Sequence, residues 1–158
     1  INESAVAAYC SPMQRAKDTA APFIKQSGLE LQILDGLAEI DKYADEYISP
    51  HMMKSNPELF KAFLKNPYEV CKIDPEEFYR DVTSAFGQIA ESHPGERVVV
   101  FSHAIAINVY FADILEKGSD FFGMIPSNCS ISRVQIARDG RRSIKAFNDT
   151  GHFSFSNV

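Results

Sequence analysis

The sequence predicts a three-layer α/β fold, in which helices cover both faces of a mostly parallel central sheet. Short apolar runs, typical of strands buried on both faces, alternate along the chain with longer segments of helical periodicity. Near the end, two segments with alternating apolar and polar residues, 129–137 and 143–148, flank the turn Arg138-Asp139-Gly140-Arg141. This last pattern predicts an antiparallel hairpin with an Asp-Gly turn.

Length and composition indicate a single soluble domain. The chain has 158 residues, enough for one domain with a sizeable core, and we expect residues 1–158 to form that domain. The net charge of −5 argues against a general nucleic-acid-binding protein, because phosphate-backbone binding needs a basic face. No apolar run approaches the roughly 20 residues that span a bilayer, so no membrane partner is expected.

The three cysteines predict no disulfide framework and no zinc site. Cys10, Cys71 and Cys129 are odd in number, and their spacing matches no zinc pattern. Cys10 and Cys129 lie in apolar stretches, so we expect both to be buried thiols. A reducing compartment follows from this usage, and a cytoplasmic location is expected.

The first third of the chain predicts a strand, a helix and a second strand. Residues 5–10 are apolar and predict a buried strand. Ser11 is then expected to cap a helix whose first residue is Pro12 and which Gly28 ends. Residues 29–34 alternate apolar and polar side chains, which favours a strand nearer an edge of the sheet.

The segment 35–73 is irregular, but it contains one short amphipathic pattern. Residues 57–65 predict a helix that buries its four apolar side chains, Leu59, Phe60, Phe63 and Leu64. Met52, Met53, Phe60 and Tyr68 are more often local core than the lining of a ligand pocket, and both interpretations stay open. After this segment, Asp74 is expected to cap a helix that runs to about Ser92.

The run Val98-Val99-Val100-Phe101 predicts a buried strand that ends at Ser102 and His103. A helix over residues 104–117 follows it. Open α/β sheets bind ligands at the carboxyl ends of their strands, and a helix amino terminus favours an anion there. His103 is therefore a candidate site residue, although a capping or core histidine is an equally good interpretation of this position alone.

Three further features converge on the same edge of the sheet. Arg15 follows the first strand, where its planar guanidinium suits a phosphate or a carboxylate. Glu39 and Asp41 follow the second strand, and a partly desolvated carboxyl group there could act as a general acid. Asn128 precedes the hairpin, where backbone N–H groups could face the same cleft.

Taken together, these segments resemble the histidine phosphatase superfamily, the phosphoglycerate-mutase-like enzymes. Residues 11–20, Ser-Pro-Met-Gln-Arg-Ala-Lys-Asp-Thr-Ala, are similar to its second motif, and Leu37-Ala38-Glu39-Ile40-Asp41 is similar to its acid-bearing segment. Residues 98–104 resemble the strand that ends in its second catalytic histidine, with Ala104 where the family usually has Gly. Residues 128–131 and 148–152 are similar to its closing motifs, in the family's order.

The resemblance implies phosphoryl transfer through a phosphohistidine, with no metal and no cofactor. Carried over by position, Arg15 is the second arginine, His103 the second histidine and Glu39 the acid that protonates the leaving oxygen. Arg15, His103, Ala104 and Asn128 are expected to contact the phosphate. Cationic side chains would stabilise a dispersed negative charge, which is most of what phosphoryl transfer requires. The segment 43–73 is expected to be a variable insertion on the substrate side.

The chain has one large departure from the family. The Arg-His-Gly motif that carries the nucleophile would lie before Ala5, and only four residues precede that position. We therefore expect an N-terminally truncated fold, with two strand edges unpaired and the nucleophilic histidine upstream of this chain. We expect this fragment alone to be inactive and to fold poorly.

The leading hypothesis is a phosphatase acting on a small or mid-sized phosphomonoester. A phosphoglycerate-type mutase is less favoured, because residues 35–73 lack the basic character needed to hold a substrate with two acidic ends. A non-catalytic phosphate-binding module that lacks the nucleophile is the alternative from another class, and a plain interaction domain is the third. The oligomeric state stays open, although strand edges or the apolar region 50–68 could serve a homodimer.

Overall fold

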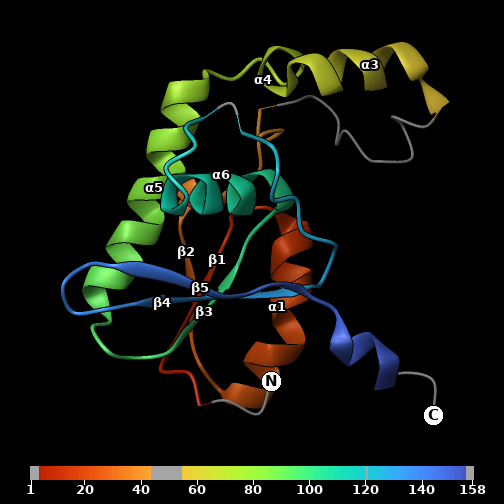
Figure 1. Cartoon of the computed structure of the whole chain (residues 1–158). Helices are drawn as coiled ribbons and strands as arrows, with labels where there is room; N and C mark the ends of the chain where they lie inside the picture. Colours follow the sequence, from red (N-terminus) through yellow and green to blue (C-terminus); the bar gives the residue numbers. More distant parts are fainter. Residues whose placement is uncertain (1–3, 44–54, 120, 156–158) are drawn as a thin grey trace.

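The computed structural model describes residues 4–43, 55–119 and 121–155, and its secondary structure confirms the α/β class (Figure 1). Three parallel strands form one sheet in the order β2-β1-β3, and two antiparallel strands form the hairpin β4-β5. The strands are β1 (Ala7–Cys10), β2 (Leu31–Ile33), β3 (Val98–Phe101), β4 (Ile131–Ile136) and β5 (Arg142–Asp149). The helical elements are α1 (Gln14–Ser27), η1 (Asp35–Leu37), α3 (Pro57–Lys65), α4 (Pro67–Val70), α5 (Pro75–Ser92), α6 (Ala104–Ile114) and η2 (Gly151–Phe155).

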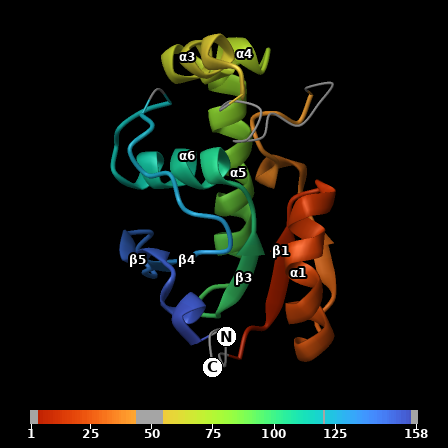
Figure 2. The ribbon, with the colours of Figure 1, turned by 90° about the vertical axis from the view of Figure 1, so that its right-hand side faces the viewer.

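Side chains that alternate along β1 produce the layers. Ala7 and Tyr9 pack with Ala85 and Ile89 of α5, while Cys10 packs with Ala16 and Ala20 of α1. Successive residues of a strand point to opposite faces, so α5 and α1 cover opposite faces of the parallel sheet. Figure 2 shows the sheet between these two helices, as the sequence predicts.

The register of the parallel sheet aligns the carboxyl ends of its strands. Cys10 of β1 lies opposite Phe101 of β3 and opposite Ile33 of β2, and Ser11 N–H donates to the Phe101 carbonyl at 2.9 Å. β2 is an edge strand, as predicted. The prediction that β3 is fully buried is wrong, since its four residues are only half-buried. Within the described sheet β3 is the other edge strand, paired along one side only.

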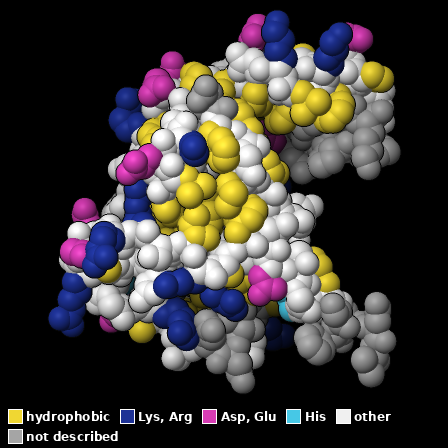
Figure 3. All heavy atoms as spheres, in the orientation of Figure 1, with side chains coloured by type: hydrophobic (Ala, Val, Ile, Leu, Met, Phe, Trp, Pro, Cys, Tyr) yellow, Lys and Arg dark blue, Asp and Glu magenta, His cyan; other side chains and the backbone are white. Residues whose placement is uncertain are grey.

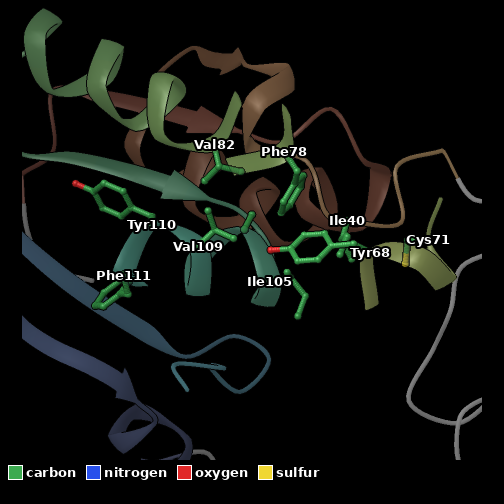
Figure 4. Packing of buried hydrophobic residues seen from close by; sticks show 10 residues of the cluster. Ile40, Tyr68, Cys71, Phe78, Val82, Ile105, Val109, Tyr110 and Phe111 are labelled. Carbon is green, nitrogen blue, oxygen red and sulfur yellow. The ribbon is translucent and has the colours of Figure 1, made fainter. Parts of the chain in front are cut away.

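A second hydrophobic cluster fills the space between α5, α6 and α4. Phe78 and Val82 of α5 meet Val109 of α6 and Tyr68 of α4 (Figure 4). Phe78, Val82 and Val109 are at most 2% exposed, so the centre of this cluster is shielded from solvent. The predicted cap of α5 is confirmed, because the Asp74 carboxylate accepts the Glu77 N–H at 2.7 Å.

The start of α1 differs from the prediction. The helix begins at Gln14 with Met13 at the cap position, two residues later than expected. The Ser11 side chain accepts the Met13 N–H at 3.2 Å and so forms a local turn rather than a helix cap. The predicted end is confirmed: Gly28 is left-handed, with a φ of 71°, and donates its N–H to the Ile24 carbonyl.

Helix α3 has the predicted bounds but not the predicted burial. Phe60 is 45% exposed and Leu64 is 69% exposed, and none of the residues of α3 is buried. Figure 1 shows why: α3 and α4 form a lobe at the far end of α5, away from the sheet. Tyr68 of α4 is buried and belongs to the core, whereas Met52 and Met53 lie outside the described residues.

The hairpin β4-β5 is held to the helices by side chains. Phe147 of β5 packs on Phe111 of α6 with ring centroids 5.2 Å apart. Arg142 at the start of β5 forms an ion pair with Asp113 of α6, which also accepts a hydrogen bond from Tyr79 of α5. The expectation that Cys129 is buried is wrong, because it lies exposed in the turn before β4, with a φ of 57°.

The surface in the orientation of Figure 1 is mixed in character. Figure 3 shows apolar side chains gathered over α6 and on the underside of the α3–α4 lobe. Leu115, just after α6, and Ile125 are among the exposed large apolar residues, at 40% and 44%. None of the helices in the described part of the chain has the length and apolar character needed to cross a bilayer.

Gly36 of η1 lies directly against α5. A Cβ atom on Gly36 would lie 2.8 Å from the Ala85 Cβ and would also clash with the Asp81 carbonyl oxygen. The clash is with helix backbone, which cannot rotate away as a side-chain end can. The absence of a side chain at Gly36 therefore lets the segment that follows β2 approach α5 closely.

We expect the substitution Gly36→Ala to lower the free energy of unfolding by about 1–3 kcal/mol, because the added methyl group overpacks this contact. Urea unfolding followed by circular dichroism would measure it. Gly87→Ala is the matched control, since a Cβ there meets no atom within 4 Å. It lies inside α5, where Ala should add about 0.5–1 kcal/mol through helix propensity. A Gly36→Ala protein as stable as the wild type would contradict the close contact.

Candidate active site

The carboxyl ends of β1 and β3 bring Ser11 and His103 into contact. His103 follows β3 at the cap position of α6 and is 8% exposed. Its Nε2 lies 2.7 Å from the hydroxyl oxygen of Ser11, which is fully buried. Ser11 directly follows β1, so the parallel register of the two strands sets this contact. A buried polar pair at this edge of the sheet is the centre of the candidate site.

Arg15 reaches the same centre from the first turn of α1. Its Nε–H donates to His103 Nδ1 at 3.3 Å, and its terminal Nη2 donates to the Asp41 carboxylate at 2.7 Å. The Arg15 side chain is 31% exposed, whereas the Asp41 side chain is only 5% exposed. The guanidinium is thus held between a buried carboxylate and an imidazole, with part of its surface open to solvent.

These contacts assign the proton of His103. Because the Arg15 Nε–H donates to Nδ1, that nitrogen accepts, and we place the proton of the neutral ring on Nε2, where it donates to Ser11. Burial, with the Arg15 charge as a second cause, lowers the pKa of His103 to about 4. At neutral pH the imidazole is therefore an uncharged donor rather than a cation.

Glu39 lies at the amino terminus of α6. Its Oε2 accepts the Ile105 N–H at 3.1 Å, and its Oε1 accepts the Ile40 N–H at 2.9 Å. Although the residue as a whole is only partly buried, both carboxyl oxygens face protein backbone. Desolvation raises the pKa of Glu39 to about 7, against the opposing effect of its two backbone hydrogen bonds.

Contacts of the segment 35–41 hold both carboxylates in place. The Ser102 hydroxyl donates to the Leu37 carbonyl at 2.9 Å, and Leu37 itself is fully buried. The Glu39 N–H lies 3.4 Å from the sulfur of Met13, at the start of α1. Three strand ends therefore contribute to one cluster: Ser11 and Arg15 after β1, Glu39 and Asp41 after β2, and His103 after β3.

The sequence-predicted site residues fall into two groups. The structure brings together Arg15, Glu39, Asp41 and His103, and Ala104 is the next residue, at the first position of α6. Asn128 is exposed in the turn before β4, and no hydrogen bond described for it reaches the cluster. Sequence reasoning missed the role of Ser11. The signal for this role is the position of Ser11 directly after a buried strand, a position that also suits a helix cap.

The other described histidines lie elsewhere. His93, at the end of α5, bonds the Tyr9 hydroxyl and the Glu96 carboxylate, each at 2.9 Å. His152 is exposed in η2. Across residues 4–43, 55–119 and 121–155, no group of three or more His, Cys, Asp and Glu side chains could hold a metal ion. An open surface recess of about 430 Å³ lies between η1 and α5, and none of the clustered site residues lines it.

The family model described as the histidine phosphatase superfamily, branch 1, matches residues 2–150. The chain belongs to this superfamily. Its fold agrees with that membership: the solved structure of YhfR from Bacillus stearothermophilus aligns with a TM-score of 0.78. That alignment covers 96% of this chain and 77% of YhfR, at 18% sequence identity.

Two curated relatives match most of the length of this chain. The "Bifunctional protein Rv2228c" of Mycobacterium tuberculosis is 27% identical over 92% of this chain. The "Metal-independent phosphoserine phosphatase" of Arabidopsis thaliana is 25% identical over 96% of it. The match spans 41% of the mycobacterial protein and 65% of the plant protein, so this chain corresponds to less than two thirds of each relative.

The raised proton affinity of Glu39 predicts a pH-dependent stability. Its folded pKa of about 7 lies above the usual value of 4.5, so its favourable contribution is complete below pH 4.5 and is lost as the pH rises to 7. The neutral variant Glu39→Gln avoids this loss. We expect the variant to gain about 1–3 kcal/mol over the wild type between pH 4.5 and pH 8.

Urea unfolding of both proteins at a series of pH values would measure this difference. The control is Glu96→Gln, at a carboxylate about half exposed to solvent. A stability difference between Glu39→Gln and the wild type that stays constant with pH would show that Glu39 titrates normally.

Proposed function

We propose that this chain forms most of the active site of a phosphatase that hydrolyses a small or mid-sized phosphomonoester through a phosphohistidine. The observation that carries the proposal is the cluster at the strand ends, where a guanidinium, an imidazole and a carboxyl group with raised proton affinity meet. The nucleophile in this proposal is a histidine upstream of Ile1.

Arg15 and His103 are proposed to hold the phosphoryl oxygens. Phosphoryl transfer spreads negative charge over three oxygens, and donors fixed around them supply most of the catalysis. Arg15 offers a charged planar group and His103 an uncharged N–H, and the two are already bonded to each other. The backbone at Ala104 and the amide of Asn128 are proposed as further donors. Asn128 would have to approach the cluster when substrate binds.

Glu39 is proposed as the general acid. The nucleophilic nitrogen attacks phosphorus, the bond from phosphorus to the ester oxygen breaks, and the Glu39 proton goes to that oxygen. Water then attacks phosphorus, breaks the phosphorus–nitrogen bond and gives a proton back to Glu39, so inorganic phosphate and the free histidine are regenerated. A pKa of about 7 keeps much of the acid form present near neutral pH.

The substrate proposal rests on the exposed apolar side chains of α3, which lies within residues 43–73. Phe60 and Leu64 of α3 are exposed and apolar, which favours a leaving group with little charge. Because the Arabidopsis relative is a metal-independent phosphoserine phosphatase, phosphoserine is one substrate to include in a test panel. The same exposed apolar surface disfavours a mutase, whose substrate carries two acidic ends.

A phosphate-binding module without turnover is the alternative from a different class. Arg15, His103 and Ser11 would bind an oxyanion whether or not a nucleophile is present. Phosphate binding without hydrolysis, measured on the full-length protein, would favour this alternative over the enzyme.

Replacement of the acid should depend on the leaving group. In the full-length protein, we expect Glu39→Gln to lower kcat/KM for phenyl phosphate by about 10²–10⁴-fold, because kcat/KM reports formation of the phosphohistidine and phenolate needs a proton as it leaves. The effect on p-nitrophenyl phosphate should be much smaller, since p-nitrophenolate leaves readily without one. Steady-state kinetics with both esters would measure the two ratios. Equal losses would contradict a general-acid role for Glu39.

The substitution His103→Ala should lower kcat for p-nitrophenyl phosphate by about 10²–10³-fold, because it removes a donor to the transferring phosphoryl group. His93→Ala is the matched control. His93 lies at the other end of β3 from His103 and bonds Tyr9 and Glu96, so its loss should leave kcat near the wild-type value. Comparable losses in the two variants would contradict the assignment of His103.

A further inference from the structure

Asp41 is a buried carboxylate that lies near a second carboxyl group, that of Glu39, and pairs with Arg15. Its side chain is 5% exposed, and its described hydrogen bond is to Arg15, at 2.7 Å. It lies two residues after Glu39, in the segment that follows β2. A buried carboxylate beside another carboxyl group is costly unless it is paired, so the Arg15 contact is what makes this position tolerable.

The contact fixes the orientation of the Arg15 guanidinium. Asp41 holds the terminal Nη2, and His103 Nδ1 accepts from Nε at the other end of the same edge. A planar group held at two points keeps one plane and one direction, and flat recognition of a phosphate depends on such a fixed fork.

The charge of Asp41 also acts on Glu39, because the Glu39 carboxylate turns along the chain towards Asp41: its Oε1 accepts the N–H of Ile40, the residue between them, at 2.9 Å. Among the residues that the structure describes, the titratable and charged groups near these two carboxyl groups are Arg15 from α1, His103 at the start of α6 and Cys71 after α4. Burial is the main cause of the raised pKa of Glu39; of the two charges that act on it, that of Asp41 raises the pKa and that of Arg15 lowers it. Loss of the Asp41 charge would therefore favour the ionised form of Glu39 twice over, because Arg15 would also lose its counter-ion.

We propose that Asp41 is a positioning residue with two tasks: it holds Arg15 in the orientation that receives the phosphoryl oxygens, and its negative charge keeps Glu39 in the acid form. This inference rests on the proposed phosphatase function. It assigns Asp41 no contact with the substrate and no proton transfer.

The test is the variant Asp41→Asn in the full-length protein, which keeps the shape of the side chain and removes its charge. We expect the Kd for inorganic phosphate, measured by calorimetry, to rise about 10-fold, because Arg15 loses a charged hydrogen-bond partner. We also expect the alkaline limb of the kcat–pH profile for phenyl phosphate to move to lower pH. A merely structural role for Asp41 would leave that limb in place.

Asp81→Asn is the matched control. The substitution removes the ion-pair partner of Lys42, whose Nζ lies 3.3 Å from the Asp81 carboxylate. Lys42 directly follows Asp41 in the sequence, but the substitution leaves the cluster of site residues unchanged. The control should change neither the phosphate Kd nor the pH profile. An unchanged or lower Kd in Asp41→Asn, or an alkaline limb that stays in place, would overturn the proposal.

A second readout separates this inference from the proposed function. The proton of Glu39 can be followed by ¹³C NMR of its labelled carboxyl carbon, which requires no turnover. If the wild type binds phosphate but hydrolyses no ester, the phosphatase proposal fails. In that case the phosphate Kd still tests whether Asp41 holds Arg15. The titration of the Glu39 carboxyl carbon tests the second task and should shift to lower pH in Asp41→Asn. A Glu39 titration that does not shift would overturn the second task.

Discussion

The parallel pairing of β1 with β3 sets Cys10 opposite Phe101, and the residues that follow each strand then lie side by side. Ser11 and His103 meet there at 2.7 Å, and the start of α1 carries Arg15 to the same point. A slip in this register would separate the hydroxyl from the imidazole and turn every side chain of one strand to the other face. The site thus depends on backbone pairing more than on any loop.

The positions of the strand ends could be predicted from the sequence, because each apolar run is short and stops at a polar residue. Arg15 and His103 could be chosen by chemical type and position, whereas the choice of Glu39 over Asp41 as the acid depends on the family resemblance. The structure brings these residues together. The pairing of Arg15 with Asp41 could not be predicted from the sequence. It joins residues 26 apart, and nothing in the local pattern distinguishes a counter-ion from a second acid.

Burial was predicted less well where it depends on distant packing. The pattern of α3 is amphipathic, yet Phe60 and Leu64 remain exposed because α3 lies away from the sheet at the end of α5. Cys129 lies in an apolar stretch but falls on a turn with a positive φ, so its side chain points outward from the fold. Periodicity gives the face of a helix or strand, and only the tertiary arrangement decides whether anything covers that face.

The hairpin β4-β5 forms a sheet of its own, joined to the helices through Phe111 with Phe147 and through Arg142 with Asp113 and Tyr79. Its backbone hydrogen bonds run within the hairpin and not to β3 in the described sheet. Such a unit can detach and open as a cooperative segment while the parallel sheet stays closed. Its amide protons would then exchange with solvent through a sub-global opening, and the packing of Phe147 on Phe111 together with the Arg142 anchor would set the free energy of that opening.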